Sequence, residues 1–206
     1  MLSVNTNAGA LVALENLNNT SQQLDSAQNI VSTGLLVGNA KDNGAIWSIA
    51  QSERSQVADL DAVKSSLQTG QSIIDVANSA GTTVSNLLTQ MSQKALAASD
   101  TSLDTASRNA LNNDFVALRN QITSTVANAS FNGVNLLNGS ITKITSLAST
   151  TGGSVLTTNA ENLSLGGSIV TLASTASIST VALATAAITV VNLSLQNVDK
   201  DRKSVV

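Results

Sequence analysis

Residues 60–95, LDAVKSSLQTGQSIIDVANSAGTTVSNLLTQMSQKA, carry an apolar or small residue at alternating steps of three and four positions. This is the a/d spacing of a coiled coil, and it places the repeating residues along one side of a helix. The seam consists of Leu60, Val63, Leu67, Gly70, Ile74, Ala77, Gly81, Val84, Leu88, Met91 and Ala95. We therefore predict one long helix, from about residue 45 to residue 98.

Other helices should pack against this seam. A second stripe of Ile73, Val76, Ala80 and Leu87 makes the apolar face wider than one partner helix needs. After a polar turn, where Asp100, Ser102 and Asp104 are candidate caps, the same rhythm returns in Leu111, Phe115, Leu118, Ile122 and Val126. We expect this third helix to fold back antiparallel on the second.

Helical spacing also marks both ends of the chain. In residues 8–31 one stripe is formed by Leu14, Leu17, Leu24 and Val31, and a connector rich in glycine follows at residues 32–45. Near the C-terminus the spacing returns in Val181, Ala184, Ile188, Val191, Leu195 and Val198. Between the helices, the stretch from 140 to 180 is rich in Ser and Thr, and short alternating runs surround Gly152-Gly153 and Gly166-Gly167. Those runs predict one or two β-hairpins.

The fold class that follows is mainly α, a long antiparallel helical bundle or coiled coil with a small β-hairpin region. We divide the chain into an N-terminal helix within residues 1–40 and a rod-like bundle at 41–200, with the hairpin insert at about 140–177. Isolated helices of this kind are marginal in water, so the apolar stripes should be covered by other helices and by other molecules.

The composition excludes several kinds of functional site. The chain has no His, Cys, Tyr or Pro, and its aromatic residues are Trp47, Phe115 and Phe131. Common zinc sites and catalytic groups built on His or Cys are therefore excluded. The acidic residues are scattered along the helical segments. We predict no enzyme activity, no cofactor and no metal.

Charge and hydropathy make two further classes of partner improbable. The net charge is −3, and no cluster of Lys and Arg occurs before the last six residues. This argues against nucleic acid as a partner. The longest apolar stretch, about 181–195, is interrupted by Thr and Asn and is shorter than a bilayer requires. We therefore expect no membrane insertion.

Three segments, in order along the chain, resemble one family. Residues 3–14, SVNTNAGALVAL, residues 32–45, STGLLVGNAKDNGA, and residues 131–139, FNGVNLLNG, are similar to the opening, the connector and the turn after the third helix of bacterial flagellins. The resemblance implies a subunit that is exported unfolded and polymerises into an extracellular filament for motility. It also implies that residues 1–40 are half of an inner-core coiled coil whose partner helix is missing.

The resemblance carries expectations about partners. They are other flagellin subunits in a homopolymer, a flagellar export chaperone and the filament cap. The stretch 88–98, LTQMSQKALAA, resembles the part of flagellins that an innate immune receptor recognises. Gln90 stands there where the family usually has Arg, and Lys94 where it has Leu. We therefore expect weak recognition by that receptor.

The last residues depart from the family. Flagellins return through a complete rod helix and a second inner-core helix, whereas this chain stops after DRKSVV at residues 201–206. This string breaks the composition abruptly, and the codons GAT CGG AAG AGC GTC GTG, which resemble a sequencing adapter, would encode it. Our interpretation is a gene fragment whose C-terminal end is missing and whose residues 201–206 are a spurious tail.

Two alternatives to a filament subunit remain open. A hook–filament junction protein shares the opening helix and the rod, although its connector tends to carry Pro where this chain has Asn43-Gly44. A secreted adhesin built on a helical bundle would bind a host partner instead of its own copies.

Overall fold

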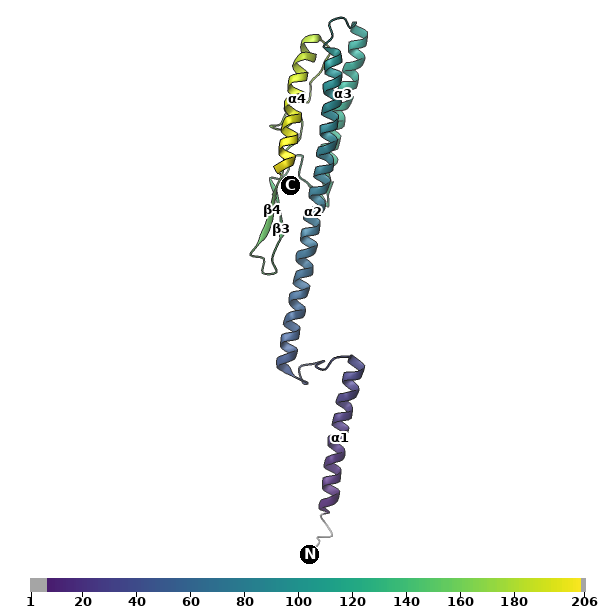
Figure 1. The fold of residues 1–206 in the computed structure, drawn as a ribbon, viewed down its shortest axis with the longest axis vertical. Coiled ribbons are helices and arrows are strands. Elements are labelled where there is room, and N and C mark those ends of the chain that lie inside the picture. Colours follow the sequence, from purple (N-terminus) through teal and green to yellow (C-terminus); the bar gives the residue numbers. More distant parts are fainter. Residues whose placement is uncertain (1–6, 205–206) are drawn as a thin grey trace. The chain divides into compact units, whose positions relative to one another are not determined.

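The computed structural model describes the backbone of residues 7–204 and the side chains of residues 7–201. The chain divides into two units, one ending at Asp59 and the other beginning at Leu60. The described residues form the helices α1 (Ala8–Thr33), α2 (Gly44–Ala98), α3 (Thr105–Asn128) and α4 (Val181–Ser204), and the short strands β1 (Ser130–Phe131), β2 (Val134–Asn135), β3 (Lys143–Leu147) and β4 (Val155–Asn159). This mainly helical architecture confirms the predicted fold class (Figure 1).

In the first unit, local signals set the ends of α1. Asn7 is the N-cap, and its side chain accepts a hydrogen bond from the backbone N–H of Ala10. Gly34 ends the helix in a left-handed conformation with φ of 68°, and its N–H donates to the carbonyl of Ile30. Such a residue satisfies carbonyls that the last turn leaves free, and glycine adopts this φ without strain. The part of residues 1–40 that precedes Asn7 lies outside the described residues.

In the second unit, α3 and α4 lie beside the C-terminal half of α2 (Figure 1). Side-chain contacts show the direction of each helix. Ser85 of α2 contacts Asp199 of α4, and Ser92, seven residues later on α2, contacts Asn192, seven residues earlier on α4. The helices α2 and α4 are therefore antiparallel.

The turn between α2 and α3 is organised by its polar residues. Asp104 is the N-cap of α3, and its carboxylate accepts a hydrogen bond of 2.6 Å from the N–H of Ser107. This backbone hydrogen bond lowers the pKa of Asp104. Arg108, on the first turns of α3, donates to the carbonyls of Ala98, Asp100 and Leu103. The guanidinium thus closes the turn by satisfying carbonyls at the end of α2.

One hydrophobic core joins the three helices of the second unit to the segment before α4. Fully buried side chains at its centre include Leu88 and Met91 from α2 and Phe115 and Ile122 from α3. From α4 the core receives Ala184, Ala187, Val191 and Val198. Each large apolar side chain contributes ~1.5–3 kcal/mol when it is fully buried.

The strands form two small antiparallel pairs. In β1–β2 the turn is Asn132-Gly133, where both residues have positive φ, as a two-residue type I′ hairpin requires. In β3–β4, Lys143 pairs with Asn159 and Leu147 pairs with Val155, with Gly152-Gly153 in the connecting loop. The strands thus occupy only part of the region at 140–177. Gly166-Gly167 lies in an irregular turn and forms no strand pair, contrary to the possibility of a second glycine-turn hairpin there.

The residues from 160 to 180, which we call the strap, connect β4 to α4 without regular structure. The strap buries Leu163, Ile169, Val170, Leu172 and Ile178 in the core. Side chains of both neighbouring helices bind its backbone. On α3, Asn112 accepts a hydrogen bond from the N–H of Ile178, and Arg119 donates to the carbonyl of Ala176. On α4, Ser194 accepts from the N–H of Thr171.

Candidate functional surfaces

The seam predicted on α2 changes character along the helix. At its start, Leu60 is 58% exposed and Leu67 is 36% exposed, whereas Val63 between them is buried. Ile74 is half-buried against the core, and Val84, Leu88 and Met91 have no exposed surface. The C-terminal half of the seam is therefore a core within the chain, and the first half keeps apolar side chains in solvent.

The predicted residues of α3 all belong to the core region. Phe115 and Ile122 are fully buried, and Leu111 and Leu118 are half-buried against the same core. The structure thus brings these four side chains together with Val84, Leu88 and Met91 of α2. That they also make contacts between subunits stays a prediction.

The stripe predicted on α1 is open to solvent. Leu14 is 55% exposed, Leu17 62%, Leu24 56% and Val31 84%, and no residue of α1 is buried. An apolar stripe of this extent on a helix is typical of a surface that another helix covers. Its role in an inner core stays a prediction.

Sequence reasoning missed a third exposed group at the start of α2. Ile46, Ile49 and Val57 are each more than half exposed, and they precede the exposed Leu60. Extending the alternation backwards from Leu60 reaches Ile49 and Ile46, although Gln56 and Glu53 interrupt it, and Val57 lies beside this line. The signal was present, but the charged residue weakens it. This group belongs with the α1 stripe among the candidate contact surfaces.

Polar contacts between helices are few and lie at the rim of the core. Lys94 on α2 forms an ion pair of 2.7 Å with Asp114 on α3. Both side chains are partly exposed, so the pair contributes little to stability. The Ser85–Asp199 and Ser92–Asn192 contacts bind α4 in a fixed register on α2.

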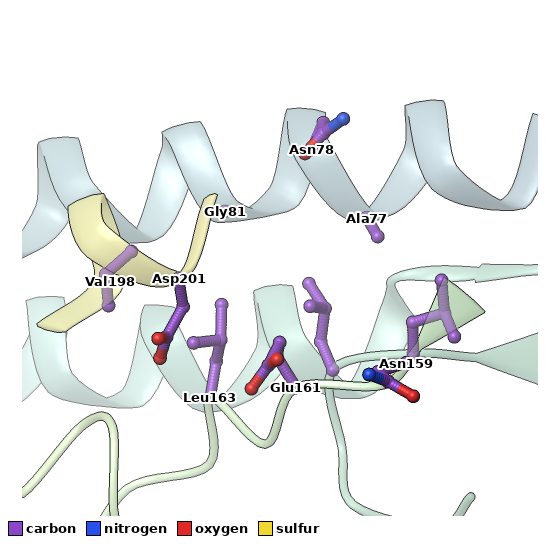
Figure 2. A pocket seen from close by; sticks show the side chains of 10 residues that line it. Ala77, Asn78, Gly81, Asn159, Glu161, Leu163, Val198 and Asp201 are labelled. Atoms are coloured by element: carbon purple, nitrogen blue, oxygen red, sulfur yellow. The ribbon is translucent and has the colours of Figure 1, made fainter. Parts of the chain in front are cut away.

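A cavity of about 30 Å³ lies where α2, the strap and the end of α4 meet (Figure 2). Its lining includes Ala77, Gly81, Leu163 and Val198, so it is mostly apolar, and its volume suits about one water molecule. Glu161 and Asp201 also line it. Burial, together with the charge of Asp201, raises the pKa of Glu161. The cavity is too small for an organic cofactor.

Among residues 7–201 no metal centre is found, whereas one helix meets the length and hydropathy criterion for a membrane span. Among the described residues, no group of three His, Cys, Asp or Glu side chains could hold a metal ion. One stretch of helix, Val181–Asp201, is long and apolar enough to cross a membrane, with a mean hydropathy of 1.5. This corrects the expectation that the stretch is too short. Its apolar side chains include Ala184, Val191 and Val198, which are buried in the bundle core. In total 28% of the apolar window is buried in the fold, and the core helices of bundles pass the same test of length and hydropathy.

The comparisons with known proteins point to one family. The family described as "Bacterial flagellin N-terminal helical region" matches residues 4–142. The chain is 50% identical over 194 residues to flagellin FljO of Caulobacter vibrioides. The aligned residues cover 94% of this chain and 70% of that protein. It is 35% identical over 149 residues to a flagellin of Brucella melitensis, covering 72% of this chain and 52% of the relative.

A solved structure shares the fold. The crystal structure of Bacillus cereus flagellin superposes with a TM-score of 0.58 at 22% sequence identity, covering 66% of this chain and 78% of that one. At this identity the likeness concerns the fold alone. The matches with the family and with the Caulobacter relative show more than a shared fold, because both are similarities of sequence over most of the chain.

Proposed function

The chain belongs to the flagellin family, and we infer from this membership that it is a structural subunit of the bacterial flagellar filament. The filament is an extracellular appendage for motility, and its subunits polymerise with other flagellin subunits. A structural role requires no catalytic group, and we propose that the chain has no enzyme activity.

The observation that carries this proposal is the 50% identity to a flagellin along 94% of the chain. The exposed apolar side chains of α1 and of the start of α2 support it, because polymerisation would remove them from water. We assign the stripe of Leu14, Leu17, Leu24 and Val31 to an inner core, and the helical bundle of residues 41–200 to the rod of the subunit. Leu60 and Leu67, the exposed part of the α2 seam, would then contact neighbouring subunits.

Electron microscopy of cells that make the protein tests the proposal. Deletion of the gene should remove the filaments, or remove this subunit from filaments built of several flagellins, and re-expression of the full-length gene should restore them. Filaments that form but detach from the cell would favour a hook–filament junction protein. Filaments unaltered in number, length and composition would contradict both assignments and favour an adhesin.

We also propose that the subunit is exported unfolded, with the help of a flagellar export chaperone, and added beneath the filament cap. The sequence has no Cys, so no disulfide can trap a folded form before export. Secretion should stop when the flagellar export apparatus is deleted, with the protein then found inside the cells. Undiminished secretion in that strain would contradict this route.

Recognition by the innate immune receptor should be weak. Lys94, where the family usually has Leu, is bound to Asp114 in an ion pair, so this part of the α2–α3 surface is charged. The full-length protein should activate receptor reporter cells poorly at nanomolar concentration. The double substitution Gln90→Arg with Lys94→Leu should increase activation, whereas Gln93→Ala, at an exposed neighbouring position, should not. Strong activation by the unaltered protein would contradict the proposal.

A further inference from the structure

Two residues of α2, Ser66 and Gly70, contact the β3–β4 hairpin one helical turn apart. The N–H of Leu147 donates a hydrogen bond of 2.9 Å to Oγ of Ser66. Gly70 is buried, and a Cβ added to it would collide with Oγ of Ser146 and would lie 3.4 Å from Cβ of Ser146. Successive turns of α2 therefore meet adjacent residues of β3, Ser146 and Leu147. The hairpin lies beside α2 in Figure 1.

Glycine in the middle of a helix needs a physical reason. It lowers helix stability relative to alanine, because it loses more backbone freedom on folding. Gly70 has a helical backbone, so no positive φ calls for glycine there. The close approach of Ser146 supplies the reason, since Ser146 is itself buried at 7% exposure.

An open groove borders this contact. A groove of about 540 Å³ lies between α2 and the strand, and its lining includes Ser65, Thr69, Lys143 and Thr145 beside Gly70 and Ser146. On β4, the strand that pairs with β3, Val155 and Leu156 are each more than half exposed. Ile144 of β3 packs against the core, and the contacts at Ser66 and Gly70 therefore set how the hairpin lies on α2 beyond that attachment.

We propose that Gly70 and Ser66 are positioning residues that dock the β3–β4 hairpin on α2. Gly70 provides the space for Ser146, and Ser66 provides the acceptor for the N–H of Leu147. Together they fix the distance and the register between the hairpin and the helix, and hence the place at which Val155 and Leu156 are presented to solvent. This inference is independent of the proposed function, because it concerns contacts within the second unit alone.

Distance measurements between two spin labels test this docking in the full chain. The sequence has no Cys, so Gln68→Cys on α2 and Thr157→Cys on β4, both exposed, provide unique attachment sites. In this background Gly70→Ala should lengthen and broaden the distance distribution. Ser146→Ala removes the Oγ that an alanine at residue 70 would meet, so the double variant should regain the original distribution. The matched control is Gly44→Ala in the same helix, where an added Cβ meets nothing within 4 Å.

A second variant removes the hydrogen bond without adding any atom. Ser66→Ala should speed the amide exchange of Leu147 by about three- to tenfold, the range expected for the loss of one hydrogen bond. This arm remains informative if Gly70→Ala destabilises the whole unit. An unchanged distribution in Gly70→Ala, no rescue by Ser146→Ala, or unaltered exchange of Leu147 in Ser66→Ala would each overturn the proposal.

Discussion

At the scale of single residues, burial separates leucines that look alike in the sequence. Leu88 and Leu96 are both on α2 within the heptad region, but Leu88 has no exposed surface and Leu96 is 64% exposed. The a/d spacing places Leu88 on the seam and Leu96 off it. The same side chain therefore stabilises the core at one position and covers little at the other.

Truncation of Leu88 should test this difference. Leu88→Ala leaves a cavity in the core that also contains Met91 and Phe115, and it should lower the free energy of unfolding by ~2–5 kcal/mol. Leu96→Ala, on the same helix, should change it by less than about 0.5 kcal/mol. Urea denaturation followed by circular dichroism measures both. Equal effects of the two substitutions would show that the seam is not the core of the bundle.

Glu161 should make stability depend on pH in an unusual direction. Burial and the nearby charge of Asp201 raise the pKa of Glu161 in the folded protein (Figure 2). The free energy of unfolding should therefore fall as the pH rises from the pKa of the unfolded chain through the pKa of the folded protein, because the folded protein must then hold the charged carboxylate. Glu161→Gln keeps the shape and removes the charge. The variant should melt at a higher temperature than the parent at neutral pH, and the difference should vanish below the unfolded value of about 4.3. A melting-temperature difference that stays constant across this range would contradict the effect.

Single polar residues were the hardest feature to predict from the sequence. Arg119 and Asn112 bind backbone groups 57 and 66 residues away in the sequence, and no spacing pattern indicates these contacts. The caps were predictable, because Asp104 acts on the N–H of Ser107 three residues later. A hydrogen bond between residues close in the sequence can be predicted from their spacing, whereas a contact between distant segments cannot.

At the scale of elements, the helices followed from the period of the apolar residues. The predicted long helix at 45–98 corresponds to α2 at Gly44–Ala98, and the rhythm that begins at Val181 corresponds to the start of α4. The strap was not predicted. Its buried residues occur in a Ser- and Thr-rich stretch without periodicity. Its backbone is bound partly by side chains of α3 and α4 and partly by carbonyls outside any strand, such as those of Leu136 and Leu137. Turn-forming glycines at residues 166 and 167 were therefore mistaken for a possible hairpin.

The hydrogen bond from the strap to Asn112 allows a local test. Asn112→Ala leaves the N–H of Ile178 without its acceptor, which should destabilise the strap by ~1–3 kcal/mol. Limited proteolysis should then cut more rapidly within residues 160–180, while helical circular dichroism stays the same. Asn113→Ala is a matched control, because this neighbour is exposed and the same helix-propensity gain applies. Cleavage rates that match in the two variants would contradict the anchoring role of Asn112.

At the scale of the whole molecule, the chain keeps two kinds of apolar surface. The core of the second unit is closed by its own helices and strap, and the stripes on α1 and on the start of α2 are exposed. A subunit that polymerises needs both kinds, because the first lets it fold and the second gives association its free energy. The two requirements can therefore be separated by substitution.

Substitution on the α1 stripe should impair assembly and leave folding intact. Leu17 is 62% exposed, so Leu17→Gln removes apolar surface without opening a cavity, and glutamine retains good helix propensity. We expect the thermal unfolding of the second unit to stay unchanged. Incorporation into filaments, measured by sedimentation and electron microscopy of cells that express the full-length gene, should fall strongly because the contact between helices loses apolar area.

Asn19→Gln is the matched control for this substitution. It lies two residues from Leu17, a rotation of about 200° around the helix, and so faces away from the stripe. It should assemble like the parent. If Leu17→Gln assembles equally well, the α1 stripe is not a contact surface. If it instead lowers the unfolding temperature of the second unit, the stripe is needed for folding, and the separation of a self-sufficient core from a separate assembly surface fails.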